Sequence, residues 1–228
     1  MVPHRLSVVV LALAWVLASQ GHAAEHAWAR SRYQRLLTAQ NAFTQSQLME
    51  RGLTPLATLQ AQRRQVRQAI FSDPYMMLGL PAVEIELARN GLVTLTVLGP
   101  NRALEPVVLP RSAWTELMDS EAGTPSVFSG FPSYKVWKKR IRALPKSPGP
   151  MPPPPPICHG WGVTLGATGS EGVRYGGAGD CSGDREKLAH VAHYARLAVL
   201  TRPTCEFDAA SPFWSFQRCF SPPRPASG

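Results

Sequence analysis

The feature that most restricts how this chain can fold is a run of five prolines, Pro152–Pro156. Proline fixes φ and has no backbone N–H, so such a run cannot continue a helix or enter the middle of a sheet. It adopts the extended polyproline II conformation and acts as a semi-rigid spacer. We therefore predict a linker over residues 145–157, between one section at 24–144 and another at 158–220. The tail beyond them, 221–228, is expected to be disordered.

Residues 1–23 have the three-part pattern of a secretory signal peptide. His4 and Arg5 precede an apolar stretch, Leu6–Ala18, and a segment of small residues ends at Ala23. The apolar stretch of about 13 residues is shorter than the roughly 20 that a membrane-spanning helix needs. We therefore expect cleavage after Ala23 and an exported protein, periplasmic or extracellular, without a transmembrane span. The alternatives are a retained anchor or a buried N-terminal helix.

Positive charge is distributed unevenly along the chain. The sequence has 24 Lys and Arg against 15 Asp and Glu, a formal net charge of +9. Basic residues are concentrated at 24–72 and 133–157, and acidic residues between these two blocks. Basic blocks favour an anionic partner, such as lipid head groups, lipopolysaccharide or an acidic protein. Nucleic acid is expected only if the protein takes part in DNA transfer. Solubility, or pairing with the acidic middle, is the alternative explanation.

Apolar residues at helical spacing dominate the N-terminal section. Residues 25–51 are predicted to form a helix that ends at Gly52, a common C-terminal stop. A second helix is predicted to start at Pro55, with Thr54 as its N-cap, and to end at Asp73.

The pattern then changes to the two-residue alternation of strands. Val83–Leu87, Leu92–Leu98 and Glu105–Leu109 are predicted strands, and Asn90–Gly91 is a strong signal for a two-residue hairpin turn. This predicts a small antiparallel meander. Ser112 is expected to cap a short helix that continues to Met118.

Residues 133–144 predict a basic amphipathic helix with aromatic and aliphatic residues on one side. Its basic side could bind an anionic membrane surface or other phosphates. The candidate anion-binding residues are Lys135, Trp137, Lys138, Lys139 and Arg142. In the alternative interpretation Trp137 docks into the core and the basic side is only solvated, which is the more common outcome for a helix this short.

The section after the linker contains all four cysteines, Cys158, Cys181, Cys205 and Cys219. An even number in an exported chain predicts two disulfides. Of the three possible pairings, the one with Cys181–Cys205 is disfavoured, because a helix predicted at 184–200 is about 24 Å long and lies between these two cysteines. The favoured pairing is Cys158–Cys181 with Cys205–Cys219, because the first bond would close the strand pair and the second would tie down the tail. Zinc sites and catalytic thiols are the less favoured alternatives, because zinc ligands are usually closely spaced cysteines. Reduction is expected to loosen this section and to spare the preceding one.

The other elements of the C-terminal section are a strand at 161–167 and a partner strand at 172–175. Two weak catalytic candidates lie near them. Glu186, His190 and His193 share one face of the predicted helix and could bind a metal, although that face is expected to point to solvent. His159 could approach Asp180 as a general base if the neighbouring cysteines are bonded.

These patterns predict an α+β fold: an N-terminal helical section, a small antiparallel meander with amphipathic helices, and a disulfide-stapled αβ C-terminal section. The glycine-rich segments lack the order of a phosphate-binding loop, and no cofactor is expected. The favoured function is an exported, non-enzymatic binding protein with basic surfaces, such as an accessory factor of an envelope, secretion or conjugation system. The alternative is an exported hydrolase that uses His159 or the Glu186, His190 and His193 set.

Overall fold

The structure is a computed structural model. It describes residues 4–72, 81–99, 104–128, 134–143, 160–180 and 184–220, with side chains from Ala27 onward except at positions 140 and 143. Its elements, in chain order, are α1 (His4–Glu50), α2 (Leu56–Ala61), β1 (Gln65–Ser72), β2 (Ala82–Leu87), β3 (Val93–Leu98), β4 (Val107–Leu109), α3 (Arg111–Gly123), the 3-10 turn η1 (Pro125–Phe128), α4 (Tyr134–Ala143), β5 (Gly162–Gly169), β6 (Gly172–Gly179), α5 (Arg185–Leu200) and α6 (Pro212–Phe220).

The chain divides into two compact units. The first, which we call the helical unit, consists of Met1–Gln40 and Pro132–Met151 and contains most of α1 together with α4. The second, the sheet unit, consists of Asn41–Phe131 and Pro152–Gly228. In the part of the chain that the structure describes, no helix has the length and apolar character needed to cross a membrane.

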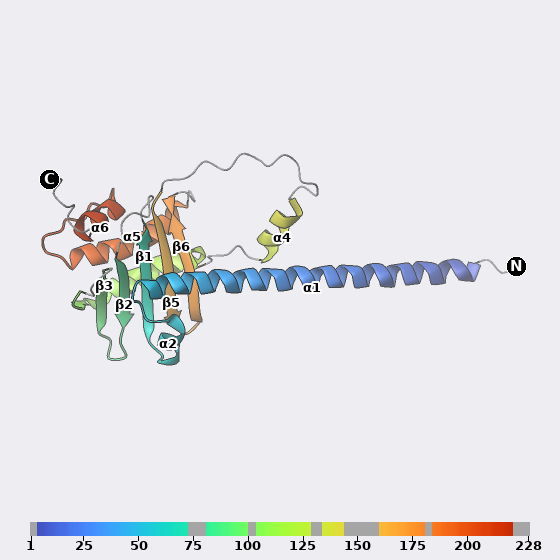
Figure 1. Cartoon of the computed structure of the whole chain (residues 1–228), viewed down its shortest axis with the longest axis horizontal. Helices are drawn as coiled ribbons and strands as arrows, with labels where there is room; N and C mark the ends of the chain where they lie inside the picture. Colours follow the sequence, from blue (N-terminus) through green and yellow to red (C-terminus); the bar gives the residue numbers. More distant parts are fainter. Residues whose placement is uncertain are drawn as a thin grey trace. The chain divides into compact units, whose positions relative to one another are not determined.

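A six-stranded antiparallel sheet forms the centre of the sheet unit, in the order β4-β3-β2-β1-β5-β6 (Figure 1). β1 pairs with β2 on one side and with β5 on the other, so that Ala69 lies opposite both Val83 and Leu165. The α+β fold class is confirmed, and so is the meander β2-β3-β4. Because β5 and β6 belong to the same sheet, the two sections that we expected on either side of residues 145–157 share it.

The central strand β1 is the largest departure from the sequence-based expectation. We predicted one helix from Pro55 to Asp73, but α2 ends at Ala61 and Thr54 does not cap it. Arg63 has a φ of 56°, a left-handed conformation that a helix does not continue through. The strand that follows is buried on both faces, so its sequence lacks the alternation typical of a half-exposed strand.

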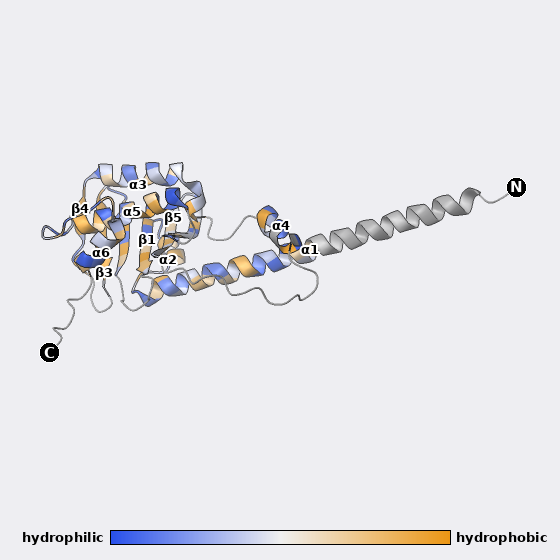
Figure 2. Cartoon of the chain, turned by 90° about the horizontal axis from the view of Figure 1, so that it is seen from above, coloured by the Kyte–Doolittle hydropathy of each residue, from blue (hydrophilic) through white to orange (hydrophobic). Residues whose placement is uncertain are grey.

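Two separate hydrophobic cores cover the two faces of the sheet. On one face, Phe71 of β1 packs with side chains of α3, α5 and α6, and its ring centroid lies 4.2 Å from that of Phe216. On the other face, Val66 and Ile70 pack with α2 and with Leu48 at the end of α1. Figure 2 shows α3 and α2 on opposite sides of the strands. Each fully buried side chain of this size contributes about 1.5–3 kcal/mol relative to an exposed one.

Two glycines allow this close packing. A Cβ on Gly166 of β5 would lie 2.7 Å from Leu56 Cδ1 and 2.9 Å from Leu48 Cδ1. A Cβ on Gly176 of β6 would lie 2.0 Å from the backbone oxygen of Val127, so only glycine lets η1 cross this strand. The glycine-rich segments of the sequence therefore serve the approach of neighbouring elements.

The predicted bounds of the remaining helices match the observed bounds to different degrees. The predicted helix at 25–51 corresponds to the second half of α1, which ends one residue earlier, at Glu50. α5 follows its predicted bounds, with Asp184 accepting a hydrogen bond from the backbone N–H of Lys187 at its start. α3 differs: it follows Pro110 rather than a Ser112 cap, and it continues past Met118 to Gly123. α6 had no sequence-based prediction.

A disulfide joins Cys205, in the loop after α5, to Cys219 in the last turn of α6, with their Cα atoms 5.7 Å apart. This half of the predicted pairing is confirmed. Cys158 and Cys181 lie outside the described residues, as does the tail at 221–228. The disulfide holds α6 against the sheet, where Phe213 and Phe216 are part of the core.

We expect replacement of both Cys205 and Cys219 by serine to lower the free energy of unfolding by about 2–4 kcal/mol, because it opens a short covalent loop. α6 and β1 share one core, so the loss should extend to the whole sheet instead of sparing the N-terminal section. Urea denaturation followed by both far-UV circular dichroism and tryptophan fluorescence measures this. Two well-separated transitions in the variant would show that α6 unfolds independently.

Candidate functional site

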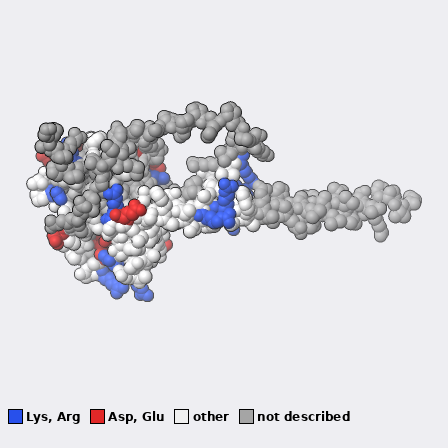
Figure 3. Space-filling model, in the orientation of Figure 1, with Lys and Arg blue, Asp and Glu red and all other residues white. Residues whose placement is uncertain are grey.

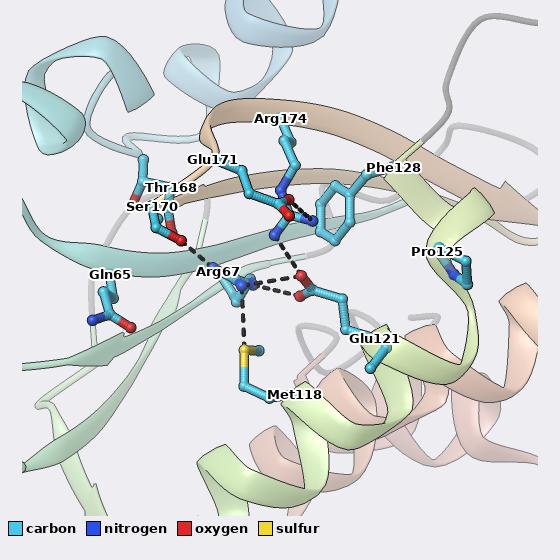
Figure 4. A pocket seen from close by; sticks show the side chains of 12 residues that line it. Gln65, Arg67, Met118, Glu121, Pro125, Phe128, Thr168, Ser170, Glu171 and Arg174 are labelled. Atoms are coloured by element: carbon cyan, nitrogen blue, oxygen red, sulfur yellow. Dashed lines mark hydrogen bonds and ion pairs between the residues drawn. The ribbon is translucent and has the colours of Figure 1, made fainter. Parts of the chain in front are cut away.

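A pocket of about 570 Å³ lies in the sheet unit between β1, α3, η1 and the β5–β6 hairpin (Figure 4). Its lining combines charged, polar and apolar side chains. The residues that carry its chemistry are Arg67, Met118, Glu121, Phe128, Glu171 and Arg174.

The ion pair between Arg67 of β1 and Glu121 of α3 lies at the centre of this pocket (Figure 4). Arg67 Nε donates to Glu121 Oε2 at 2.6 Å and Arg67 Nη2 donates to Oε1 at 3.1 Å, a two-point contact. Their side chains are only 6% and 10% exposed. Arg67 also donates to the backbone oxygens of Val66 and Thr168 and to Met118 Sδ. Each nitrogen of this guanidinium therefore has an acceptor, as a buried charge requires.

Arg174 of β6 is the second cation beside Glu121. Its Nη2 donates to Glu121 Oε1, and its guanidinium carbon lies 4.6 Å from the centroid of the Phe128 ring. Its Nη1 lies 3.3 Å from Glu171 Oε2, but the side chain of Glu171 is 72% exposed. An exposed pair of this kind contributes little to stability. Arg174 is thus held firmly by Glu121 on the inside and weakly by Glu171 at the mouth of the pocket.

Glu121 remains ionised in this environment. Burial opposes its ionisation, but the hydrogen bonds and charges of Arg67 and Arg174 outweigh burial and lower the pKa of this carboxyl below its ordinary value. One carboxylate therefore joins α3 to two strands of the sheet.

The pocket provides charged groups for binding, and the hydroxyl of Thr168 in its lining is already hydrogen-bonded to the backbone. Thr168 Oγ1 donates to the backbone oxygen of Arg64 and accepts from the N–H of Val66. The lining residues that the structure describes include no His or Cys. None of the residues that we singled out from the sequence lies in this pocket.

His190, a predicted metal ligand and catalytic candidate, is fully buried, so the expectation that it points to solvent is wrong. Its Nδ1 lies 3.0 Å from Ser120 Oγ, and its ring packs edge-on against Tyr194. Burial lowers its pKa to about 4, which keeps the imidazole neutral at pH 7. The expectation was wrong because α3 packs against α5. It covers His190, which lies outside the apolar stripe of α5, as well as the stripe itself.

The predicted metal set is not assembled in the structure. Glu186 is exposed and His193 is half-buried. Within the described residues, no group of three or more His, Cys, Asp or Glu could hold a metal ion. Asp180 accepts a hydrogen bond from the backbone N–H of Trp161, and its predicted partner His159 lies outside the described residues.

The predicted anion-binding residues lie in the helical unit. Trp137 is buried, with its ring centroid 5.6 Å from that of Tyr33 on α1 and 6.0 Å from that of Tyr134. The Lys138 ammonium lies over the Tyr134 ring. The three remaining predicted residues are exposed: Lys135, Lys139 and Arg142. The helix therefore docks its tryptophan inward and also presents basic side chains outward.

α1 adds further basic side chains to this unit. The Arg30 guanidinium carbon lies 5.8 Å from the Tyr134 ring centroid, and that of Arg32 lies 5.4 Å from the Trp28 ring centroid. Arg35 is exposed as well. Residues 27–40 and 134–143 contain no Asp or Glu. Figure 3 shows Lys and Arg side chains forming a blue patch on this unit. We call the exposed set the basic surface: Arg30, Arg32, Arg35, Lys135, Lys139 and Arg142.

A comparison of this chain with protein-family models, with curated proteins and with solved structures finds no match.

We expect Glu121→Gln to lower the free energy of unfolding by about 3–5 kcal/mol, because it leaves Arg67 buried without a countercharge. The lowered pKa of Glu121 also means that the stability it contributes is present above about pH 4.5 and is lost as the pH falls through its folded pKa. Urea denaturation of the wild type and the variant over a range of pH measures both effects, and the variant should lose less stability on acidification.

Glu171→Gln is the matched control, since it removes the same charge from the exposed pair with Arg174 and should change stability by less than about 1 kcal/mol. Equal, small effects of the two substitutions would contradict the central role of Glu121.

Proposed function

We propose that this chain is an exported protein that binds an anionic component of the cell envelope through the basic surface of its helical unit. The partner in this proposal is a phosphate-bearing surface, such as lipid head groups or lipopolysaccharide. The observation that carries it is the basic surface itself: six exposed Lys and Arg side chains, with no acidic residue in segments 27–40 and 134–143.

The charge of this unit is not neutralised from within. Its segments 27–40 and 134–143 contain basic residues and no Asp or Glu, so no carboxylate within these two segments offsets their positive charge. Each Lys or Arg near an anionic membrane surface contributes about 1 kcal/mol to binding, and the attraction decays within a Debye length. Six such side chains suffice for salt-dependent surface binding.

Apolar side chains beside these charges favour a membrane interface as the partner. Trp28 is 55% exposed on α1, and Val136 and Ile141 are exposed on α4. Tryptophan combines an apolar ring with a polar N–H and prefers the boundary between water and lipid. Helices with basic and aromatic residues side by side are typical of proteins that lie on anionic membranes.

Export is supported by two features at opposite ends of the chain. The N-terminal 23 residues have the order of charge, apolar run and small residues that a signal peptide requires. The disulfide between Cys205 and Cys219 is typical of proteins that mature in an oxidising compartment.

Reversal of three exposed charges tests the proposed binding. We expect a variant with Lys135→Glu, Lys139→Glu and Arg142→Glu to bind phosphatidylglycerol-containing vesicles at least about a hundred-fold more weakly, since it removes roughly 3 kcal/mol of attraction. Co-sedimentation with vesicles at low and high salt measures this, with phosphatidylcholine vesicles for comparison.

The control variant carries Arg89→Glu, Arg185→Glu and Arg218→Glu, three exposed residues of the sheet unit. It has the same net charge as the test variant and should keep most of the binding. Equal losses in both variants would mean that only total charge matters. Binding of the wild type that ignores salt would contradict an electrostatic surface.

Processing of the N-terminus tests export. We expect the protein recovered from the producing cell's envelope or medium to begin at Ala24, because Ala23 provides the small residue that signal peptidase requires. The intact mass shows where the chain begins, and Ala23→Arg should block cleavage. Recovery of the wild-type chain with its first 23 residues, in the cytoplasm, would contradict the proposal.

A further inference from the structure

A second pocket, of about 440 Å³, lies in the sheet unit where α5 and α6 meet the start of β5. Its described lining has three aromatic side chains, Trp161, Phe213 and Trp214. Small residues such as Ala189 and Ala192 provide much of the remaining wall and leave the space open. None of its lining residues belongs to the basic surface or to the pocket around Glu121.

The aromatic rings form two walls at nearly a right angle. The Trp161 and Trp214 rings meet edge to face, with centroids 5.7 Å apart and planes at 82°. Phe213 stacks on Trp161 with centroids 5.8 Å apart. Trp161 is buried, whereas Trp214 is 55% exposed. Exposed tryptophan rings at a pocket rim are typical of residues that dominate binding energy.

Core packing does not account for the position of Trp214. Its neighbours in α6, Phe213 and Phe216, face the core and pack with Phe71. Trp214 points outward and leaves more than half of its surface in contact with water. Because its ring contacts the buried Trp161 ring, Trp214 is restrained in its orientation while its other side stays exposed, and a ligand can pack against it with little further loss of side-chain entropy.

Asp180 is the one charged side chain among the described residues that line this pocket. Its Oδ2 accepts a hydrogen bond from the backbone N–H of Trp161 at 3.2 Å, which fixes the carboxylate beside the aromatic walls. Among the described residues it forms no ion pair, although the chain has an excess of basic residues. The pocket therefore carries negative charge.

The structure around the pocket is rigid. The Cys205–Cys219 disulfide ties α6 to the loop that precedes it. Asp208 of the same loop donates its backbone N–H to Ser215 Oγ of α6, and Asp208 Oδ1 accepts from the N–H of Ala210. Pre-organised walls lower the entropy lost on binding.

We propose that this pocket binds an organic ammonium group, with Trp214 and Trp161 as aromatic walls and Asp180 as the countercharge. Tryptophan is the side chain that attracts cations most strongly through its ring face, and a carboxylate adds direct attraction. A small, largely apolar pocket suits an ammonium group carried by alkyl carbons, and the Asp180 carboxylate can accept a hydrogen bond where the nitrogen keeps its hydrogens. Such a group occurs in choline head groups and in the lysine side chains of proteins.

Choline and its neutral isostere 3,3-dimethyl-1-butanol separate cation recognition from simple apolar binding. We expect choline to shift the indole N–H signals of Trp161 and Trp214 in NMR spectra of the full chain, and to bind about tenfold more tightly than the alcohol. N-acetyl-lysine-methylamide forms a second arm: tighter binding of choline would indicate a head-group ligand, and tighter binding of the lysine derivative a protein partner. Binding of neither cation, or equal binding of the alcohol, would overturn the proposal.

Single substitutions locate the site. Asp180→Asn keeps an oxygen for the Trp161 N–H, and Trp214→Ala changes an exposed side chain, so both variants should fold. Each should weaken choline binding about tenfold or more. Trp28→Ala is the matched control, because Trp28 has the same 55% exposure but lies on α1. Unchanged binding in the Asp180 and Trp214 variants, or an equal loss in the Trp28 variant, would contradict the assignment.

Discussion

The ion pair between Arg67 and Glu121 is the interaction on which the sheet unit depends. Arg67 lies on β1, a strand in the interior of the sheet. Its charge is buried in the core on the face of the sheet that α3 covers. A buried cation is tolerated only when an anion and hydrogen-bond acceptors surround it. Glu121 supplies the anion, so α3 must pack at this place for the sheet to be stable. Through Arg174 the same carboxylate also holds β6.

A polar contact on the opposite face of β1 complements this pair. The Gln68 amide donates to Glu84 Oε2 at 2.8 Å and to the backbone oxygen of Thr54 at 3.0 Å. Burial outweighs this hydrogen bond and raises the pKa of the Glu84 carboxyl. Both faces of one strand thus carry a polar group within an otherwise apolar layer. Such contacts specify one register, because a slip by one residue would bury each group without its partner.

Elements with local signals could be predicted from the sequence, and elements defined by distant contacts could not. The turn at Asn90–Gly91 predicts the β2–β3 hairpin, and the amphipathic spacing around Trp137 predicts α4, because each signal lies within a few residues. The length of the helix between Cys181 and Cys205 argued against a bond between these two, and the pairing of Cys205 with Cys219 was favoured because it ties down the end of the chain. β1 was mistaken for a helix, since its burial on both faces comes from α2 and the end of α1 on one side and from α3, α5 and α6 on the other. The Arg67–Glu121 site was missed for the same reason: its residues lie about 54 positions apart, and each alone resembles a solvent-exposed charge.

The pairing of β1 with β5 also has a consequence for the order of events during synthesis. Arg67 lies opposite Ala167 in this pairing, about 100 residues later in the chain. Contacts this distant in sequence form late and slow the folding rate. Until β5 has been made, one edge of β1 has no partner, and until residues 185–220 have been made, the face that α3 covers lacks α5 and α6. The pairing of β1 with β5 therefore cannot form until most of the chain has been made, which leaves a role for a chaperone that shields the unpaired strand.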